Sequence, residues 1–322
     1  MGSLPGVTRK ISETEEGVRP LRNWLSSSQY AAFEAAGTNA HRIFSSPGGW
    51  VERFGGDLLV SYKDEPVRDT TLETLPDWCA TTGFQPQRVF GKFLPKQNDE
   101  RSAPVLISGD ESLPLETVVT ENGMRFGLDF AAGYSAGLFI DQRANRALVR
   151  RGGIKKLLNT FAYTCSFSVA GALAGAETVS IDLSKKSLDR GRENFAHNEL
   201  STDGHRFLAD DVLDVLPRLA KRGEKFDCII LDPPTFSRGN KGRRWQVESH
   251  LEGLLTAALE LAAPQAKLLL STNCTKFTRR GLETVARFAL KLTRMNGSFH
   301  NEPEPPDVPF GSNSQTVWLN LR

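Results

Sequence analysis

The second half of the chain alternates short apolar runs with longer stretches in which apolar residues recur every three or four positions. The runs predict strands at 156–162, 178–183, 205–209, 226–232, 266–273 and 315–321. The longer stretches predict helices at 168–176, 185–198, 210–222, 246–262 and 279–292. Repeated strand–helix units of this length imply an α/β fold, with a parallel sheet between two layers of helices.

The first part of the chain has a different pattern. Up to about Gly48, apolar residues at helical spacing predict a packed helical segment, and they are Leu21, Trp24, Leu25, Tyr30, Phe33 and Ile43. From residue 49 to about 130, short alternating runs are broken by Gly, Pro and Asp, which is typical of a small β-rich unit.

Asn122-Gly123 stands between two strand-like runs and supplies the positive φ angles of a tight turn, so a hairpin is predicted there. Small residues follow, and then a basic helix-like run. We place a domain boundary near Gly133. It divides an N-terminal helical segment plus small β-rich domain (1–132) from the α/β domain (133–322).

Composition supports a globular protein of 322 residues, with 39% apolar residues and a net charge of +2. No apolar run is long enough to span a membrane, and the first residues lack the apolar run of a signal peptide. The four cysteines form no CxxC pair and have no close His partner, so neither disulfides nor a metal site are expected. We expect a cytoplasmic protein.

Ligands of parallel sheets bind at the carboxyl ends of the strands, so the residues that follow each predicted strand are the candidate site residues. The exit 159–168 contains no glycine, which argues against the GxGxxG turn that cradles a pyrophosphate. Asp182 ends the next strand, where an acid accepts hydrogen bonds from ribose hydroxyls. The two observations fit an adenosine ligand without a pyrophosphate. The alternative role for Asp182 is the N-cap of the following helix.

Asp210 and Asp211 close the third strand of the series. One carboxylate could reach an adenine amino group, and the other could cap the helix that begins at Val212. A capping role for the pair alone is the other interpretation.

Asp232 at the fourth exit is followed by two prolines, which lack N–H donors and fix their own φ angles. We expect the neighbouring carbonyls to point outward without strand or helix partners. Phe236 offers a ring on which a flipped base could stack, while Asp232 could accept from its amino or imino groups. We interpret Asp232, Pro233, Pro234 and Phe236 as a base-binding corner; a Pro-terminated strand with a core Phe is the alternative.

Cys274 at the fifth exit precedes Lys276, Arg279 and Arg280, whose positive field would favour a thiolate, so it is a candidate nucleophile. An inert packing role is the alternative. Two basic segments, 143–156 and 238–244, flank the same edge. We expect both segments to contact nucleic-acid phosphates, although the first could also be a solvated helix face. The second is a Gly-rich loop directly after the base-binding corner.

With these residues in view, the chain resembles the class I S-adenosylmethionine-dependent methyltransferases that modify bases of bacterial large-subunit ribosomal RNA. The resemblance runs from about Arg88 to Arg322, on the motifs at 137–146, 159–176, 181–198 and 231–238. It implies a Rossmann-like seven-stranded methyltransferase sheet with a smaller N-terminal α+β domain. The RNA-binding PUA domain that is frequent in the family has no recognisable counterpart.

The resemblance also implies roles for individual residues around S-adenosylmethionine. Phe161, Tyr163 and Thr164 would line the methionine end, Asp182 would hold the ribose, and Asp210 would lie near adenine. The cofactor-binding set implied in full is Phe139, Arg143, Phe161, Tyr163, Thr164, Asp182, Leu183, Asp210, Asp211 and Asp232, with Phe139 and Arg143 closing over the site. Asp232 to Pro234 would face the transferable methyl group.

The target atom stays open. Enzymes that methylate cytosine C5 first attack C6 with a cysteine, and the matching residue would be Cys274. Enzymes that methylate guanine N7 need only positioning, and DPPTFSR resembles those, although they carry asparagine in place of Cys274. Alternatives of other classes are a methyltransferase of a non-RNA substrate, a nucleotide-dependent oxidoreductase and a non-catalytic RNA-binding module. The oligomeric state, including a homodimer, is also open.

Overall fold

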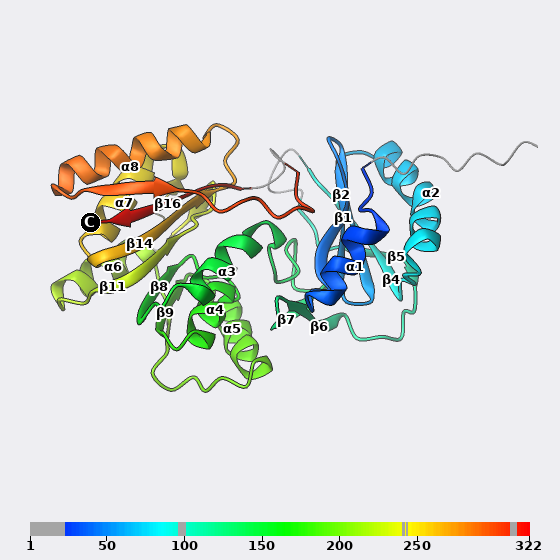
Figure 1. Cartoon of the computed structure of the whole chain (residues 1–322), viewed down its shortest axis with the longest axis horizontal. Coiled ribbons are helices and arrows are strands. Elements are labelled where there is room, and N and C mark those ends of the chain that lie inside the picture. The colour runs from blue at the N-terminus through cyan, green and yellow to red at the C-terminus, as the bar shows by residue number, and fades with distance from the viewer. Residues whose placement is uncertain (1–22, 96–100, 240–241, 243, 310–313) are drawn as a thin grey trace, which may run out of the picture.

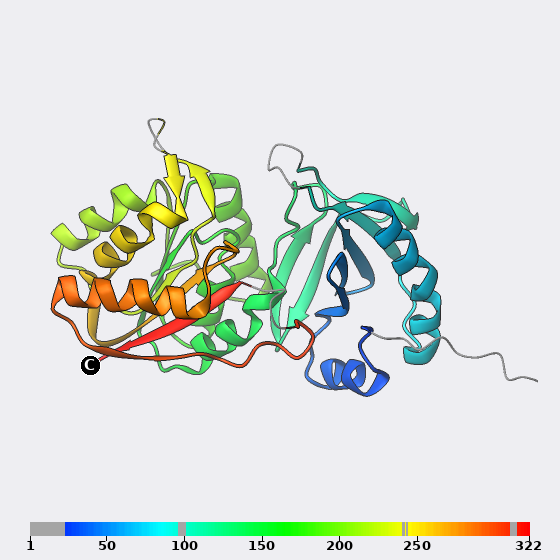
Figure 2. The same ribbon diagram turned by 90° about the horizontal axis from the view of Figure 1, so that it is seen from above.

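The computed structural model describes residues 23–95, 101–239, 242, 244–309 and 314–322. Figures 1 and 2 show two lobes side by side, with the N-terminal lobe in blue and cyan and the larger lobe in green to red. The larger lobe is built on a seven-stranded sheet in the order β10-β9-β8-β11-β14-β16-β15. Its strands are β8 (Lys156–Thr160), β9 (Glu177–Asp182), β10 (Arg206–Ala209), β11 (Phe226–Leu231), β14 (Ala262–Thr272), β15 (Gly297–His300) and β16 (Gln315–Leu321).

The pairing confirms the predicted α/β sheet and adds a feature that the sequence pattern did not contain. Strands β8 to β11 and β14 pair in parallel, whereas β16 is antiparallel to both β14 and β15. The antiparallel β16 therefore lies between the fifth and sixth strands in sequence order. The six-stranded dinucleotide-binding fold has no such insertion.

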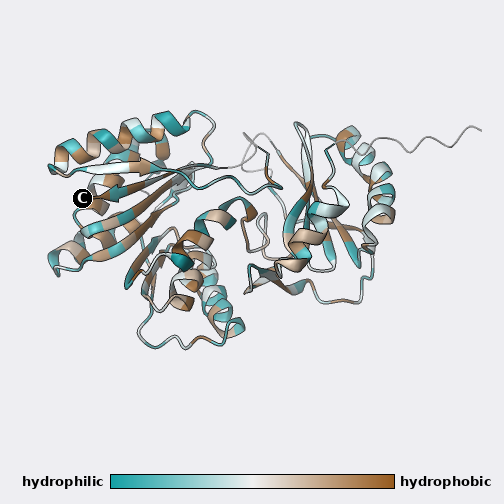
Figure 3. Cartoon of the chain, viewed as in Figure 1, coloured by the Kyte–Doolittle hydropathy of each residue, from teal (hydrophilic) through white to brown (hydrophobic). Residues whose placement is uncertain are grey.

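Helices cover both faces of this sheet. One apolar core packs α6 (Val212–Lys221), α7 (Val247–Leu259) and α8 (Arg279–Thr293) against the sheet, and a second packs α3 (Arg143–Arg151), α4 (Ser166–Leu173) and α5 (Lys185–His197). Figure 3 shows apolar residues gathered along the strands between these layers. Because the helices cover the faces, the carboxyl ends of the parallel strands are left to form a site.

The N-terminal lobe contains a five-stranded sheet in the order β1-β2-β3-β4-β5. Strands β3 and β4 are parallel, and α2 (Glu65–Thr82) connects them. The other elements are α1 (Ser27–Ala35), β1 (Ala40–Ser46), β2 (Gly49–Phe54), β3 (Asp57–Tyr62), β4 (Arg88–Phe93) and β5 (Val105–Gly109). The expected α+β class of this lobe is confirmed.

Two details of the N-terminal prediction were wrong. The helical segment predicted up to Gly48 is helical only over Ser27–Ala35, because Gly37 (φ 61) turns the chain and Ile43 lies in β1, paired with β2. Leu21 lies outside the described residues. The β-rich interval contains the long helix α2, whose N-cap Asp64 accepts a hydrogen bond from Val67 N–H.

The predicted hairpin is confirmed. Strands β6 (Glu116–Glu121) and β7 (Met124–Asp129) are joined by Asn122 (φ 49) and Gly123 (φ 75). The hairpin docks on α5, where the Gly127 N–H donates a 2.7 Å hydrogen bond to Oδ1 of Asn194. One apolar core runs continuously from this hairpin into the larger sheet, and the boundary near Gly133 stays a prediction.

Three short elements near the sheet edge were not predicted. They are the 3-10 helix η2 (Ile140–Gln142) and the two strands β12 (Phe236–Arg238) and β13 (Arg244–Gln246), which pair as a small hairpin after β11.

Over the part of the chain that the structure describes, no helix combines the length and apolar character needed to cross a bilayer.

Candidate active site

A cavity of about 420 Å³ lies at the carboxyl edge of the large sheet, a volume within the range of small-molecule sites. Residues from five strand exits form it, together with Arg101 and the segment before η2. Its lining includes Tyr134, Phe139, Gln142, Phe161, Tyr163, Asp182, Leu183, Asp211, Asp232, Pro233, Pro234 and Trp245. Among the described residues, no group of three or more His, Cys, Asp or Glu side chains could hold a metal ion.

The turn after β8 reaches a tight geometry without glycine. Phe161, Tyr163 and Cys165 have φ angles of 52°, 47° and 60°, in the left-handed region. Each non-glycine residue held there costs on the order of 1 kcal/mol, which the surrounding structure must offset. These conformations could not be predicted from the sequence, because the turn lacks the glycines that usually mark them.

Asp182 is fixed by this turn. Its Oδ2 accepts a 2.8 Å hydrogen bond from Tyr163 N–H, and its Oδ1 accepts one of 2.8 Å from Ser184 N–H. Burial raises the pKa of Asp182, and the two N–H donors oppose that rise. The N-cap of α5 is Ser184, so Asp182 is not the cap, and the lone pairs that remain on its oxygens can serve a ligand in the cavity.

The segment 134–139 forms another wall, and residues of the β8 turn hold it in place. The Tyr163 hydroxyl donates to the Ser135 carbonyl at 2.7 Å, and the Thr164 hydroxyl donates to the Gly137 carbonyl at 2.6 Å. The half-exposed Phe139 ring lies 5.6 Å from the Tyr163 ring. Tyr163 and Phe139 line the cavity, whereas Thr164 is buried behind the wall, so a direct cofactor contact is not proposed for Thr164.

Of the two acidic residues after β10, Asp211 lines the cavity, whereas the family resemblance had placed Asp210 near the adenine. Asp211 both lines the cavity and caps α6, because its Oδ1 accepts a 3.0 Å hydrogen bond from Leu213 N–H. Asp210 does not line the cavity, and its carboxylate is bonded to Arg218 on α6. Asp211 is therefore the residue of this pair that can reach an adenine.

Asp232, Pro233 and Pro234 also line the cavity. Burial raises the pKa of Asp232 to about 6, and the nearby Ser271 hydroxyl opposes that rise. The Pro234 carbonyl accepts a 2.7 Å hydrogen bond from the Trp245 indole, a side-chain donor that the sequence did not indicate. Trp245 comes from β13, a strand that the sequence pattern did not predict.

A second cavity of about 510 Å³ adjoins the first, and the two share Pro234, Asn273 and Arg101. Phe236 and Cys274 lie in its wall. Phe236 is 53% exposed, so it is not the core residue of the alternative interpretation. The structure thus brings the four residues of the base-binding corner and Cys274 to the junction of two cavities.

The positive field expected around Cys274 is weaker than the sequence suggested. Lys276 is paired with Glu248 at 3.0 Å, and Arg279 is 3.6 Å from Glu304. The Cys274 side chain is 5% exposed and packs in the core of the sheet. These acidic partners come from distant segments, which is why the local sequence overestimated the charge.

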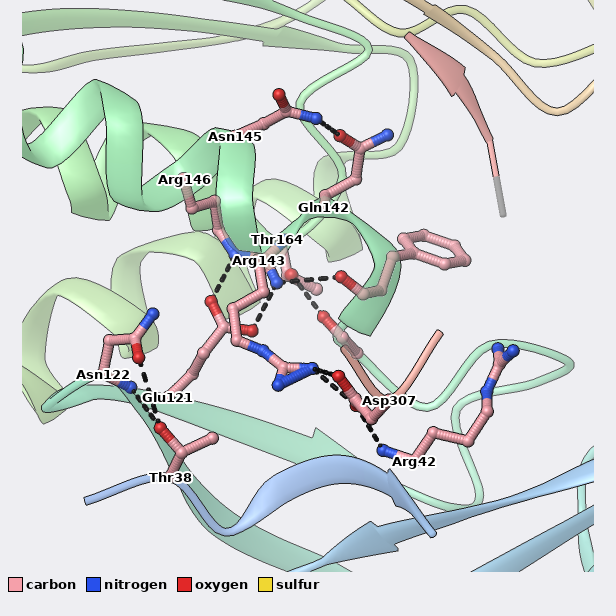
Figure 4. A network of polar contacts seen from close by, with 12 residues as sticks. Thr38, Arg42, Glu121, Asn122, Gln142, Arg143, Asn145, Arg146, Thr164 and Asp307 are labelled. Atoms are coloured by element: carbon pink, nitrogen blue, oxygen red, sulfur yellow. Dashed lines mark hydrogen bonds and ion pairs between the residues drawn. The ribbon is translucent and has the colours of Figure 1, made fainter. Parts of the chain in front are cut away.

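Two of the six cations in the basic segment 143–156 are buried in ion pairs, whereas Arg150 and Arg151 are exposed, so RNA contact by this segment stays a prediction. Arg143 on α3 is bonded to Asp307 at 2.6 Å, and Arg146 is bonded to Glu121 at 2.5 Å, with both arginines buried. Figure 4 shows these pairs at the junction of the two lobes, where Asp307 also accepts from the Arg42 N–H. Arg143 does not line the cofactor cavity, so a direct cofactor contact is not proposed for it.

The second basic segment, 238–244, is only partly described. Arg238 and Arg244 lie on β12 and β13 and are exposed, whereas residues 240, 241 and 243 lie outside the described residues. The sequence reasoning missed Arg101 and Tyr134, which line the cavity and lie 4.7 Å apart, measured from the guanidinium carbon to the ring centre. No local motif marks either residue.

The strand order and the cavity together define the class of protein, an α/β enzyme with a site for an adenosine-bearing cofactor at the carboxyl edge of its sheet. Residues 60–318 match the family described as S-adenosylmethionine-dependent methyltransferase. The chain belongs to this family, which confirms the resemblance and identifies S-adenosylmethionine as its cofactor. The oxidoreductase alternative is thereby dropped.

Individual relatives agree with this assignment. YwbD of Bacillus subtilis, named provisionally as a ribosomal RNA large subunit methyltransferase, is 30% identical over 278 residues, which are 81% of this chain and 67% of YwbD. Ribosomal RNA large subunit methyltransferase I of Escherichia coli is 31% identical over 242 residues, 71% of this chain and 57% of that protein. The crystal structure of SMU.776 complexed with SAH has the same fold, with a TM-score of 0.78 at 23% identity over 92% of this chain and 78% of that one.

The first relatives are longer proteins, and the chain covers between 20% and 67% of their length.

The residues around the cavity fit the cofactor of the family. Asp182 presents acceptor lone pairs for ribose hydroxyls, and Phe161, Tyr163 and Phe139 supply apolar walls. When bound, S-adenosylmethionine supplies a methyl group on a positively charged sulfur.

Proposed function

We propose that this protein methylates a base of structured RNA, specifically of large-subunit (23S) ribosomal RNA. The observation that carries the proposal is the junction of the two cavities at Pro234, with Asp232 in the wall of the first and Phe236 and Cys274 in the wall of the second. A base flipped into the second cavity would stack on Phe236 and meet the cofactor at this junction. The names of the YwbD and Escherichia coli relatives support this substrate class.

The cofactor would be held mainly by fixed acceptors and ring faces. Asp182 would accept from both ribose hydroxyls, Asp211 would reach the adenine amino group, and Leu183 would pack against the nucleoside. Phe161, Tyr163 and Phe139 would enclose the methionine end, next to Asp232. Methyl transfer removes the charge on sulfur, so alignment of donor and acceptor matters more than stabilisation of new charge.

Asp232 would hold the target base next to the methyl group of the cofactor. Its carboxylate faces the first cavity and can accept a hydrogen bond from an amino or imino group of the base. The proline ring of Pro233 is rigid, and the Trp245 hydrogen bond fixes Pro234, so the corner would hold the base without rearrangement.

Two target atoms are supported by different observations. The thiol of Cys274 in the wall of the base cavity favours cytosine C5, where it would add to C6 before the methyl transfer. The ion pairs of Lys276 and Arg279 reduce the positive charge available to stabilise a thiolate, which favours guanine N7, where the ring nitrogen already carries a lone pair. The Cys274 variant described in the Discussion separates the two.

RNA phosphates would contact the exposed Arg238 and Arg244 on the β12–β13 hairpin. Arg101 lines both cavities, so it would lie close to the phosphate of the flipped nucleotide. An enzyme of ribosomal RNA works where ribosomes are assembled, and we accordingly propose a cytoplasmic location.

Methylation of defined RNAs tests the proposal. Purified protein is incubated with methyl-tritiated S-adenosylmethionine and either deproteinised 23S RNA or intact large subunits, both from cells that lack the gene. Nucleoside mass spectrometry then identifies the product. We expect one methylated base to appear in one of the two substrates. Tight cofactor binding with no label in either RNA would refute the proposal and favour a non-RNA substrate.

A further inference from the structure

Three residues form a row across the N-terminal sheet. Trp50 on β2 pairs with Ser61 on β3, and Ser61 pairs with Lys92 on β4, so all three share one face of the sheet. Two residues further along the strands, Leu59 and Phe90 on this face join the core that continues into the larger lobe. The opposite face packs against α2, which Figure 2 shows on the outer side of the N-terminal lobe. The row therefore faces the lobe that carries the cavities.

The polar groups of this row have no partners. The indole N–H of Trp50 and the hydroxyl of Ser61 are buried, and neither makes a hydrogen bond to any described residue. Within the described ranges, the Lys92 ammonium also makes no hydrogen bond or ion pair. Buried polar groups in proteins are nearly always paired, so three neighbouring groups that can all donate indicate a missing acceptor.

A second cation meets Lys92 at the Tyr134 ring. The Lys92 ammonium lies 5.3 Å from the ring centre, and the guanidinium carbon of Arg101 lies 4.7 Å from it. Arg101 is exposed, and among the described residues it too has no hydrogen-bond or ion-pair partner. The ring attracts both cations through its π face and leaves their N–H groups available to an anion.

The acidic residue Glu52 on β2 does not neutralise this pair. It attracts Lys92, but it already forms a 3.5 Å ion pair with Arg42. Burial lowers the pKa of Lys92, and the positive charges of Arg42 and Arg101 lower it further. Three cations (Lys92, Arg101 and Arg42) against one acid (Glu52) leave an excess of two positive charges, which favours a bound anion.

The position of the pair relative to the cavities indicates which anion. Arg101 lines both cavities, Tyr134 lines the first, and Lys92 is not in the lining of either. The two cations therefore extend from the junction of the cavities outward onto the N-terminal lobe. A nucleotide whose base is flipped into the second cavity keeps its phosphates outside that cavity.

We infer that Lys92 and Arg101 form a phosphate-binding site of the N-terminal lobe, which holds the RNA backbone beside the flipped nucleotide. Arg238 and Arg244 would hold the same strand from the larger lobe. The inference rests on the proposed function in that RNA supplies the phosphate. The methionine carboxylate of the cofactor is an oxyanion of similar chemistry, and the experiment below separates the two sources.

The salt dependence of RNA binding counts phosphate contacts. The full-length protein is titrated with a fluorescent oligouridylate at several KCl concentrations. Each lost contact should lower the slope of log K against log salt by about 0.7. We expect this change for Lys92→Met and Arg101→Met, about twice the change for the double variant, and a nearly wild-type slope for Lys92→Arg. Lys225→Met is the matched control, because the exposed Lys225 precedes β11 at the opposite edge of the large sheet.

Wild-type slopes in both single variants would overturn the site, as would a wild-type protein that does not bind the oligonucleotide. Urea denaturation tests a structural role. Because burial disfavours the charge of Lys92, its midpoint should not fall in Lys92→Met. A lower midpoint together with an unchanged slope would make Lys92 a structural cation and would refute the inference.

Calorimetry with two cofactor analogues tests the carboxylate. S-adenosylhomocysteine carries it, and 5′-methylthioadenosine lacks it. We expect Lys92→Met to leave both Kd values unchanged. A rise of about tenfold for S-adenosylhomocysteine alone would assign the site to the cofactor and overturn the phosphate. A protein that binds RNA but methylates none would refute the proposed function, while the salt slopes would still decide the inference.

Discussion

The Asp182 carboxylate accepts a 2.8 Å hydrogen bond from the backbone N–H of Tyr163, a residue held at φ 47 in the turn after β8. The left-handed conformation directs this N–H toward the end of the neighbouring strand β9. A second N–H, from Ser184, holds the other oxygen at 2.8 Å. Two strands and the first turn of α5 therefore fix one carboxylate at the cavity wall.

Asp182→Asn should weaken cofactor binding. The substitution replaces one carboxylate oxygen by an amino group. This group cannot accept the hydrogen bond that the oxygen accepted from the N–H of Tyr163 or Ser184, nor one from a ribose hydroxyl. We expect the calorimetric Kd for S-adenosylmethionine to rise about 100-fold, since hydrogen bonds to charged groups contribute about 1.5–3 kcal/mol. Asp189→Asn on the following helix α5, where the carboxylate pairs with Lys185 at the surface, should leave the Kd unchanged. Equal affinities for the two variants would contradict the assignment of Asp182.

Cys274→Ala distinguishes the two target atoms. If the enzyme methylates cytosine C5, the loss of the thiol removes the covalent step, and turnover should fall by at least about 10³-fold. If it methylates guanine N7, turnover should stay within a few-fold of wild type. Single-turnover transfer of tritium to RNA measures both. Cys79→Ala, in the N-terminal lobe, serves as the control for loss of a thiol elsewhere.

Arg143→Met should affect stability rather than cofactor affinity. The change leaves Asp307 buried without its cation, and breaking a buried pair typically costs about 3–5 kcal/mol. Urea denaturation should show this loss, while Arg151→Met, which breaks an exposed pair on the same helix, should change stability by less than about 1 kcal/mol. A large loss of cofactor affinity with unchanged stability would instead place Arg143 at the cofactor.

Asp232→Asn should stabilise the protein at high pH. The folded pKa of Asp232, about 6, lies above the ordinary value of 3.8, so the folded state binds the proton more tightly than the unfolded state. The stability that Asp232 contributes is therefore present below pH 4 and is lost as the pH rises through 6. We expect the variant to exceed wild type by about 1–3 kcal/mol at pH 8 and to match it near pH 4, in urea denaturation at both values. Parallel stability curves would refute the raised pKa.

Much of the candidate site followed from local pattern. Asp182, Asp211 and the Asp232–Pro234 corner were predicted because strand ends are visible in the sequence, and the carboxyl ends of parallel strands meet at one edge. The Asn122–Gly123 hairpin was predicted for a similar reason, since the turn depends on the φ preferences of two adjacent residues. Such features need no knowledge of distant contacts.

Only the tertiary structure decided what the charged residues of α3 do. The sequence around Arg143 and Arg146 predicts a basic surface. In the structure the two arginines pair with Asp307 and Glu121, which lie 164 and 25 residues away in the chain. The same holds for Lys276, whose charge is matched by Glu248, and for the Pro234 carbonyl, which meets Trp245. The residue types and their order determined which chemistry the strand ends carry, because that depends on neighbours in sequence. Whether a charge is buried, paired or open to a ligand depends on folding partners, because electrostatic and hydrogen-bonding energies follow distance in space.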